Sequence, residues 1–172
     1  MDYNQLATQE AIDATLAALV EKGFAVFVVN TGAEALAKIK EFIPAGASVM
    51  NGSSVTLEQI GYIDYLKSGD HGWVNPKEAV LAEKDPAKQA LLRRQALTSD
   101  YYLGSVHALA ENGEFVIGSN TGSQMPHVVY SSPNLIFVVS TKKIVPTLAD
   151  AMKRLEEHVV PLEDEHMQQL YK

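Results

Sequence analysis

The sequence predicts an α/β fold with a mainly parallel central sheet, helices on both faces and one β-hairpin. Apolar runs of strand length alternate with segments that begin at helix-capping residues, an order typical of α/β proteins. The run FAVFVVN at 24–30 is apolar almost throughout, as expected of a strand that is covered on both faces. The length of 172 residues fits one domain. We assign that domain to 1–172, with a core at about 10–157 and a polar tail at 158–172.

The first strand–helix unit follows an N-terminal helix. Apolar residues recur at helical spacing before Gly23, and glycine is typical of the position just after a helix. After the strand at 24–30, Thr31 and Glu34 have the spacing of a capping box, in which each side chain bonds the backbone N–H of the other residue. Pro44 ends the helix that they begin. Strand, short loop and capped helix are therefore expected in direct succession.

A second unit repeats this order. GASVM at 46–50 predicts a short strand, and NGSSV predicts a loop of small residues. TLEQIGYIDYLKS at 56–68 predicts a helix, because Thr56 and Gln59 again have capping-box spacing. The repeated order is what favours parallel strands.

The middle of the chain is expected to be helical up to a β-hairpin. Asn75–Pro76 and Asp85–Pro86 each place a capping residue before a proline at the first helical position. Residues 98–100 end the second of these helices. Asn112–Gly113 predicts the hairpin within 101–118, since Asn-Gly between two strand-like runs is typical of a tight turn.

The last part of the chain predicts one more strand and one more helix. NLIFVVS at 134–140 has the apolar, β-branched composition of a buried strand. The final helix is expected to begin near Pro146 and to carry Leu148, Met152 and Leu155 on its inward face.

Composition excludes several classes of function. The net charge is −7, which argues against a nucleic-acid-binding protein because such proteins need a basic stripe. The chain has no cysteine, so disulfides, thiol catalysis and iron–sulfur ligation by this chain are excluded. No secretory signal or membrane-spanning run is present in the sequence. We therefore expect a cytoplasmic protein without a membrane or nucleic-acid partner.

Three loops that follow predicted strands share one composition. If the strands are parallel, these loops meet at the carboxyl edge of the sheet, where α/β proteins bind ligands, and helix N-termini there attract anions. Helix-capping loops use the same residue types without any ligand, so a purely structural role remains the alternative. The polar run is longest in the third loop. The predicted ligand-binding residues are Asn30, Thr31 and Gly32, then Asn51, Gly52, Ser53 and Ser54, and finally Asn120, Thr121, Gly122, Ser123 and Gln124.

The histidines do not predict a metal site. No pair has the H-E-x-x-H spacing of a zinc helix, and no metal is expected. His107 falls within a predicted strand and His127 directly after the third loop, so both can face one cavity. His127 is included among the predicted ligand-binding residues, with a structural histidine as the alternative.

Several motifs resemble one known family. SSVTLEQIG, SDYYLGSVHAL with NGE, TGS and KIVP are similar to segments of the LUD family, the lactate-utilisation proteins of the LutC and YkgG type. The resemblance covers roughly 10–157. It implies a NagB/RpiA/CoA-transferase-like fold, a bacterial source and a role in the use of lactate or a related organic acid. A homodimer is also expected from the resemblance.

The resemblance also bears on chemistry. Longer relatives carry cysteine-rich iron–sulfur modules, so redox chemistry here would need iron–sulfur oxidoreductase subunits as partners. Relatives commonly have Arg where Gln124 stands and Asn where Lys142 stands, so the preferred ligand charge can differ. Lys143, in the KIV context, is a predicted contact for a phosphate or carboxylate, with a solvated loop lysine as the alternative.

Glu111 is the candidate catalytic residue. ENG at 111–113 is similar to the motif around the glutamate of class I CoA-transferases, which passes through a covalent glutamyl thioester. CoA or a nucleotide is then the expected ligand. The alternative is an exposed glutamate beside an ordinary hairpin turn.

Three functional hypotheses remain open from the sequence. The first is a LUD-domain protein that binds a small anionic ligand (a carboxylate, nucleotide or phosphate ester) at the three loops. The second is an enzyme of the same fold, either a CoA-transferase acting through Glu111 or an enzyme of the phosphosugar or folate type. The third is a non-catalytic subunit that docks an iron–sulfur redox partner. No cofactor bound by this chain is required by any pattern in the sequence.

Overall fold

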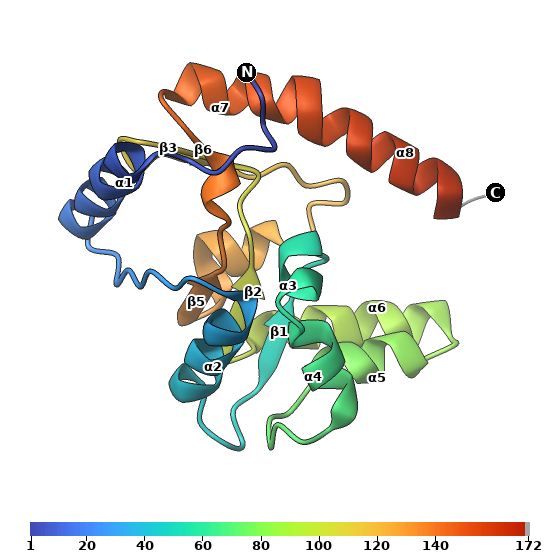
Figure 1. Cartoon of the computed structure of the whole chain (residues 1–172). Coiled ribbons are helices and arrows are strands. Elements are labelled where there is room, and N and C mark those ends of the chain that lie inside the picture. Colours follow the sequence, from blue (N-terminus) through green and yellow to red (C-terminus); the bar gives the residue numbers. More distant parts are fainter. Residues whose placement is uncertain (171–172) are drawn as a thin grey trace. The chain divides into compact units, whose positions relative to one another are not determined.

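The computed structural model describes residues 1–170, with no description of the Leu170 side chain, and it has the mixed α/β class that the sequence predicts. These residues form two compact units built from interleaved segments (Figure 1). The parallel-sheet unit comprises 29–105 and 119–138, and the hairpin unit comprises 1–28, 106–118 and the segment from Val139 onward. The assignment of 1–172 to a single domain stays a prediction, and its last two residues lie outside the described range.

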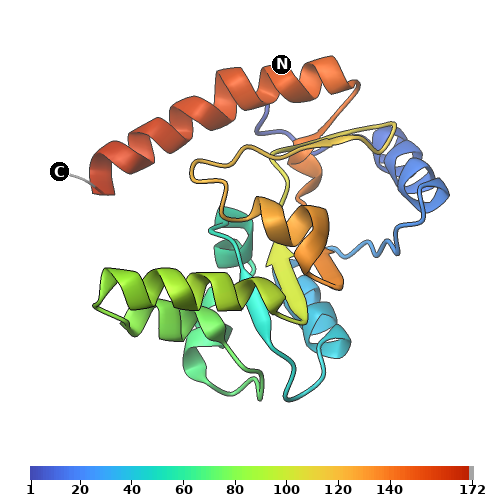
Figure 2. The ribbon, with the colours of Figure 1, turned by 180° about the vertical axis from the view of Figure 1, so that it is seen from behind.

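The parallel-sheet unit is built around three short strands. They are β1 (Val49–Asn51), β2 (Tyr101–Gly104) and β5 (Asn134–Phe137), in the order β1-β2-β5, and both pairings are parallel. Tyr101 in the central strand is paired with Val49 on one side and with Asn134 on the other. Helices surround this small sheet (Figure 2). All three strands therefore end at the same edge of the sheet.

The helices of this unit begin at identifiable capping residues. Helix α2 (Gly32–Phe42) has the predicted capping box of Thr31 and Glu34 and ends at Ile43, before Pro44. The side chain of Asp85 caps α6 (Pro86–Gln95), which continues into the 3₁₀ turn η1 (Ala96–Thr98). Helix α5 (Pro76–Ala82) has proline in its first turn, as predicted.

The helix predicted at 56–68 is divided in two. Helix α3 (Val55–Gln59) begins at Ser54, whose Oγ accepts from Leu57 N, so the prediction of Thr56 and Gln59 as a capping pair is wrong. Gly61 adopts φ +77°, a left-handed conformation open to glycine, and there the chain turns into α4 (Tyr62–Ser68). A serine two residues before Thr56 thus caps α3.

Large apolar side chains fill the core of the parallel-sheet unit. Full burial of one such side chain stabilises a fold by about 1.5–3 kcal/mol. Trp73 also donates from Nε1 to the carbonyl of Ile43 at 3.1 Å, which satisfies its polar atom. The buried cluster consists of Ile39, Ile43, Val49, Leu57, Tyr62, Leu66, Trp73 and Leu103.

The hairpin unit has a second, smaller sheet. Its strands are β3 (Ala108–Ala110), β4 (Phe115–Val116) and β6 (Ile144–Val145), in the order β4-β3-β6. Strands β3 and β4 are antiparallel and form the predicted Asn112–Gly113 hairpin, and β3 and β6 are parallel. Its buried core of Ala108, Val116, Val145 and Ala151 is small.

Helices complete the hairpin unit. The N-terminal helix α1 (Gln9–Glu21) is present, with Thr8 as its N-cap. After the 3₁₀ turn η3 (Thr141–Lys143), α7 (Leu148–Arg154) runs through the π-helical turn η4 (Leu155–Val159) into α8 (Val160–Leu170). The expected polar tail is therefore helical as far as the structure describes it.

Two strand predictions are wrong. The run at 24–30 pairs with no strand of either sheet, and Phe24, Phe27 and Val28 are exposed. This run lies where the chain passes from one unit to the other, and apolar composition does not distinguish a buried strand from an extended connection. The run at 101–110 is not one strand either, because β2 ends at Gly104 and β3 begins at Ala108 in the other sheet. The hairpin is thus shorter than the predicted 101–118.

The last helix buries a different face from the predicted one. Leu148 and Met152 are 40% and 42% exposed, so their predicted inward placement is wrong. Ala151 and Arg154, which are one turn apart, are buried instead, and Leu155 packs against the hairpin-unit core. Apolar periodicity missed this face because it carries a charged residue.

Candidate functional site

Two of the three predicted ligand loops meet at the carboxyl edge of the parallel sheet. The hydroxyl oxygen of Tyr102 is 3.5 Å from Oε1 of Gln124, which ends the 120–124 loop. A Cβ atom added at Gly52 would lie only 2.5 Å from the same hydroxyl oxygen. Loop 51–54 and loop 120–124 therefore come together over Tyr102. Loop 30–32 packs elsewhere, because Gly32 lies against Ile60 at the end of α3.

Asn51 is the central polar residue of this edge. Its side chain is buried, and Nδ2 donates to the carbonyl of Gly52 at 2.9 Å. Its Oδ1 receives no hydrogen bond from residues 1–170. The backbone carbonyl of Asn51 accepts from Nζ of Lys77 at 3.2 Å. A buried acceptor and a lysine ammonium group are thus held at one residue.

Lys77 is a cation in a partly buried position. Burial lowers its pKa from the ordinary value, and the negative charge of Glu58 acts in the opposite direction. Sequence reasoning missed this residue, because a lysine beside a proline at a helix start suggests only a solvated position. Glu58, in the first turn of α3, supplies the negative charge that acts on Lys77.

Tyr102 and His127 form a stacked pair beneath the loops. Their ring centroids are 4.5 Å apart with an interplanar angle of 14°. Nδ1 of His127 is 2.9 Å from Oγ of Ser132, and burial lowers the pKa of His127. Burial raises the pKa of Tyr102 to about 12. At neutral pH the site therefore presents a protonated tyrosine hydroxyl and a neutral imidazole.

The remaining loop residues mainly bond within their own loops. The N–H groups of Asn30 and Thr31 donate to Oε2 of Glu34 at 2.7 and 3.3 Å, as a capping box requires. In the third loop, Thr121 donates to Oγ of Ser123 at 2.9 Å, and Gly122 N donates to Ser119. Ser53 and Asn120 are exposed. These bonds account for the residue types structurally, and the role of these residues in ligand binding stays a prediction.

Glu111 and Lys143 belong to the hairpin unit. Glu111 lies in the turn between β3 and β4, where its N–H donates to the carbonyl of Val145 at 3.0 Å. Lys143 donates from Nζ to the carbonyl of Val106 at 2.9 Å, and burial, reinforced by the charge of Arg154, lowers its pKa to about 8. His107 is in the hairpin unit, whereas His127 is in the parallel-sheet unit.

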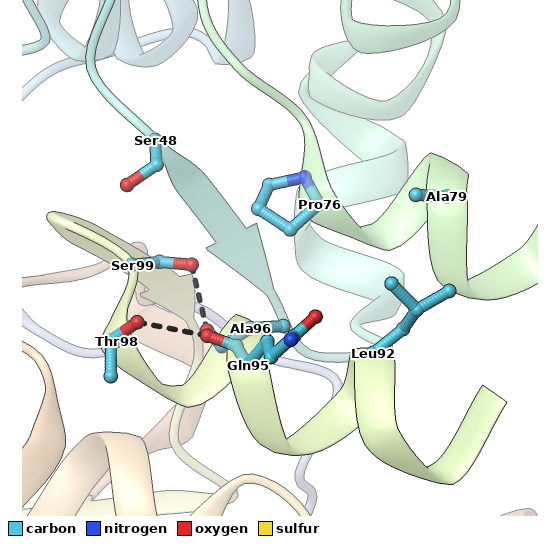
Figure 3. A pocket seen from close by; sticks show the side chains of 8 residues that line it. All are labelled: Ser48, Pro76, Ala79, Leu92, Gln95, Ala96, Thr98 and Ser99. Carbon is cyan, nitrogen blue, oxygen red and sulfur yellow. Dashed lines mark hydrogen bonds between the residues drawn. The ribbon is translucent and has the colours of Figure 1, made fainter. Parts of the chain in front are cut away.

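The structure also has a cavity at the opposite edge of the parallel sheet. Its volume is about 210 Å³, and its lining comes from Ser48 before β1, Ser99 before β2, and the helices α5 and α6 with η1 (Figure 3). The hydroxyl of Ser99 donates to the carbonyl of Ala96, and that of Thr98 donates to the carbonyl of Gln95. The lining has no charged side chain. Since ligands of parallel α/β sheets bind at the carboxyl ends of the strands, we favour the Asn51 edge over this cavity.

Within residues 1–170, no three His, Asp or Glu side chains are grouped as a metal site requires. No helix in the same range has the length and apolar character needed to cross a membrane.

The fold and the site define a mixed α/β protein whose small-residue loops meet at the carboxyl edge of a parallel sheet. A family model described as the LUD domain matches residues 12–170, which is nearly the whole chain. The chain therefore belongs to the LUD domain family, a family associated with lactate utilisation. Comparison with curated proteins and with solved structures gave no match. The expected family is thus confirmed, and the narrower NagB/RpiA/CoA-transferase-like fold stays a prediction.

Proposed function

We propose that this LUD-domain protein acts in the use of lactate or a related organic acid by binding a small anionic ligand at the carboxyl edge of the β1-β2-β5 sheet. The observation that carries the proposal is the meeting of loops 51–54 and 120–124 over the Tyr102 hydroxyl. Glycine at position 52 is needed there because a Cβ would strike that hydroxyl. The loops are therefore fitted closely around a polar group at the edge where ligands of this fold class bind.

The chemistry of the edge suits a hydroxy acid. The ammonium group of Lys77 and the hydroxyl of Tyr102 are donors for a carboxylate. Asn51 Oδ1 is an acceptor that receives no hydrogen bond from residues 1–170, and it suits the hydroxyl of a 2-hydroxy acid. Leaving a buried acceptor unsatisfied costs about 1–3 kcal/mol, so a ligand that donates to it is favoured over one that does not.

Lactate and propionate form a matched pair of probes, because they differ in the hydroxyl group. We expect lactate to raise the melting temperature of the protein more than propionate does, since a ligand that binds only the folded state stabilises it. CoA, a nucleotide and a sugar phosphate complete the panel, because the predicted ligand includes phosphate esters. If none of these anions raises the melting temperature, ligand binding at this edge is excluded.

Two lysine variants locate the site. Lys77→Gln removes the ammonium group at Asn51 and is expected to weaken binding about tenfold or more, as loss of a charge-assisted hydrogen bond does. Lys84→Gln, at an exposed position just after α5, is the matched control and should bind as the unaltered protein does. Equal affinity in both variants would place the ligand elsewhere.

Two finer proposals are kept for testing. Transfer of CoA through Glu111 rests on the resemblance of ENG to the CoA-transferase motif, and a trapped glutamyl thioester would support it. Full transferase activity in the Glu111→Ala variant would exclude CoA transfer through Glu111. Because the chain has no cysteine, a redox role requires an iron–sulfur oxidoreductase partner, and co-purification of such a subunit is the corresponding test.

A further inference from the structure

The hairpin unit gathers three basic side chains around one short segment. Lys143 from η3 donates to the carbonyl of Val106, and Nη1 of Arg154, at the end of α7, donates to the carbonyl of His107. His107 is the third basic group, and its Nδ1 accepts from Gly118 N at 3.1 Å. The two cations therefore bond adjacent carbonyl groups of the chain. This basic cluster, Lys143 with Arg154 and His107, lies wholly within the hairpin unit.

Arg154 is buried without an anionic partner among residues 1–170. Its side chain is 5% exposed, and no salt bridge joins it to a carboxylate of residues 1–170. Within the same residues, the guanidinium group donates one hydrogen bond, from Nη1, and its buried Nε donates none. The Tyr3 ring centroid lies 5.5 Å from the guanidinium carbon and 5.2 Å from the ring centroid of His158, at a tilted angle. The groups that act on the charge of Arg154 thus include an aromatic ring and basic side chains, and no carboxylate of residues 1–170 pairs with it.

The charges of the cluster act against one another. Burial lowers the pKa of His107, and the charges of Lys143 and Arg154 lower it further. Burial and then the charge of Arg154 likewise lower the pKa of His158. A buried charge is costly unless a group of opposite charge compensates it. Buried basic groups that repel one another are expected at a site that an anion completes.

We propose that the basic cluster of the hairpin unit binds a small oxyanion, a carboxylate or a phosphate group, with Arg154 and Lys143 as its donors. The Nε–Nη2 edge of a guanidinium has the planar fork that matches two oxygens of such a group. Neutral His107, whose Nδ1 accepts a hydrogen bond, carries its proton on Nε2 and adds a third donor without adding repulsion. Lys143 and His107 are partly exposed, so the cluster has access to solvent.

This site goes beyond the proposed function. Its residues come from 106–118 and the C-terminal segment, whereas the Asn51 edge belongs entirely to the parallel-sheet unit. The competing interpretation is that both cations serve only to hold the carbonyls of Val106 and His107. The two interpretations differ in whether an added oxyanion binds and in which variants lose oxyanion binding.

The first experiment uses inorganic phosphate and acetate as probes on the full chain, by calorimetric titration at constant ionic strength with chloride as the reference ion. We expect saturable binding of at least one probe, and the better probe identifies a phosphate or a carboxylate as the natural group. Lys143→Gln should weaken that binding at least tenfold. Lys142→Gln, at the adjacent exposed position, is the matched control and should leave it unchanged.

A second experiment needs no variant. The pKa of His107, followed by NMR in the unaltered protein, should rise when the oxyanion binds, because a nearby negative charge favours the protonated imidazole.

Arg154→Lys keeps the charge but removes the planar fork of the guanidinium group. Weaker oxyanion binding in that variant would show that the fork contributes to binding. Absence of saturable binding to the unaltered protein, an unchanged His107 pKa, or equal binding in Lys143→Gln and Lys142→Gln would each overturn the proposal.

Discussion

Lys77 in the parallel-sheet unit and Lys143 in the hairpin unit have the same local bonding but opposite surroundings. Each is partly buried and donates to a backbone carbonyl. The negative charge of Glu58 acts on Lys77, whereas the positive charge of Arg154 acts on Lys143. The comparison teaches that two lysines with the same backbone bond can lie in fields of opposite sign. The negative neighbour favours the charged form of Lys77, whereas the positive neighbour disfavours the charged form of Lys143.

The cores of the two units also differ in the size of their buried apolar side chains. The buried core cluster of the parallel-sheet unit contains leucine, isoleucine, tyrosine and tryptophan, whereas that of the hairpin unit consists of two alanines and two valines. Since stabilisation scales with the apolar area removed from water, the hairpin unit has less apolar burial to offset its buried charges. The loss of one buried charge is therefore expected to change stability more in the hairpin unit than in the parallel-sheet unit.

The largest effect is expected from the core of the parallel-sheet unit. Leu103→Ala removes a fully buried side chain from the central strand and should lower the free energy of unfolding by about 3 kcal/mol. Leu135→Ala on the edge strand β5, where the side chain is 39% exposed, is the control and should cost less. Urea denaturation measures both. A loss below about 1 kcal/mol for Leu103→Ala would contradict the assignment of the core.

The next largest loss of stability is expected when a glycine of the parallel-sheet unit is replaced, and a glycine of the hairpin unit serves for comparison. Gly52→Ala places a Cβ 2.5 Å from the hydroxyl oxygen of Tyr102, a buried ring stacked on His127, and should cost about 1–3 kcal/mol. Gly118→Ala meets a terminal carbon of Leu155 at 3.0 Å, which can rotate away, so its cost should be smaller.

Tyr102→Phe tests the cause of the Gly52 effect. Removing the hydroxyl leaves room for the added methyl group, so the double variant Gly52→Ala with Tyr102→Phe should recover most of the loss. Such a coupling is measured by a double-mutant cycle of unfolding free energies. Additive losses would show that the hydroxyl does not set the requirement for glycine.

A smaller effect concerns pH. Because the folded-state pKa of Lys143 is about 8 and its ordinary value is 10.5, the unfolded chain holds more protons than the folded chain between these values. Stability should therefore increase as pH rises from about 8 towards 10, by on the order of 1 kcal/mol. Urea denaturation at pH 7.5 and 9.5 measures the increase.

Lys143→Gln and Lys142→Gln separate this contribution from others. Lys77, whose pKa burial also lowers, contributes with the same sign and stays present in both variants. The increase should shrink in Lys143→Gln and persist in Lys142→Gln. The same increase in the two variants would contradict a depressed pKa at Lys143.

The smallest effect is expected at Tyr62. Its hydroxyl is buried, and no residue of 1–170 bonds it, while burial raises its pKa. Tyr62→Phe removes an unsatisfied polar group and keeps the ring, so the unfolding free energy should change by less than about 0.5 kcal/mol or increase slightly. Thermal or urea unfolding measures it. A loss of about 1 kcal/mol or more would show that the hydroxyl has a partner in solution.

Local chemistry made much of the fold predictable. The Thr31–Glu34 capping box, the Asp85 cap and the hairpin turn at Asn112–Gly113 depend on residues a few positions apart, and the structure has all three. The meeting of loops 51–54 and 120–124 followed from the expectation of parallel strands. These features were accessible because each depends on near neighbours or on strand direction alone.

The features that sequence reasoning missed depend on distant contacts. The run at 24–30 has the composition of a buried strand, yet no ladder forms there. Arg154 is buried because its guanidinium reaches the carbonyl of His107, and nothing near it in the sequence indicates that partner. Lys77 was missed for the same reason, since its partner is the carbonyl of Asn51.

The interleaving of the two units has a consequence for biosynthesis. Helix α1 is translated well before β6, the strand that it contacts. The hairpin unit therefore stays incomplete on the ribosome until β6 has emerged, and contacts of such long sequence separation slow folding. Premature termination anywhere before Ile144 would leave α1 without this neighbour and expose its apolar face to chaperones.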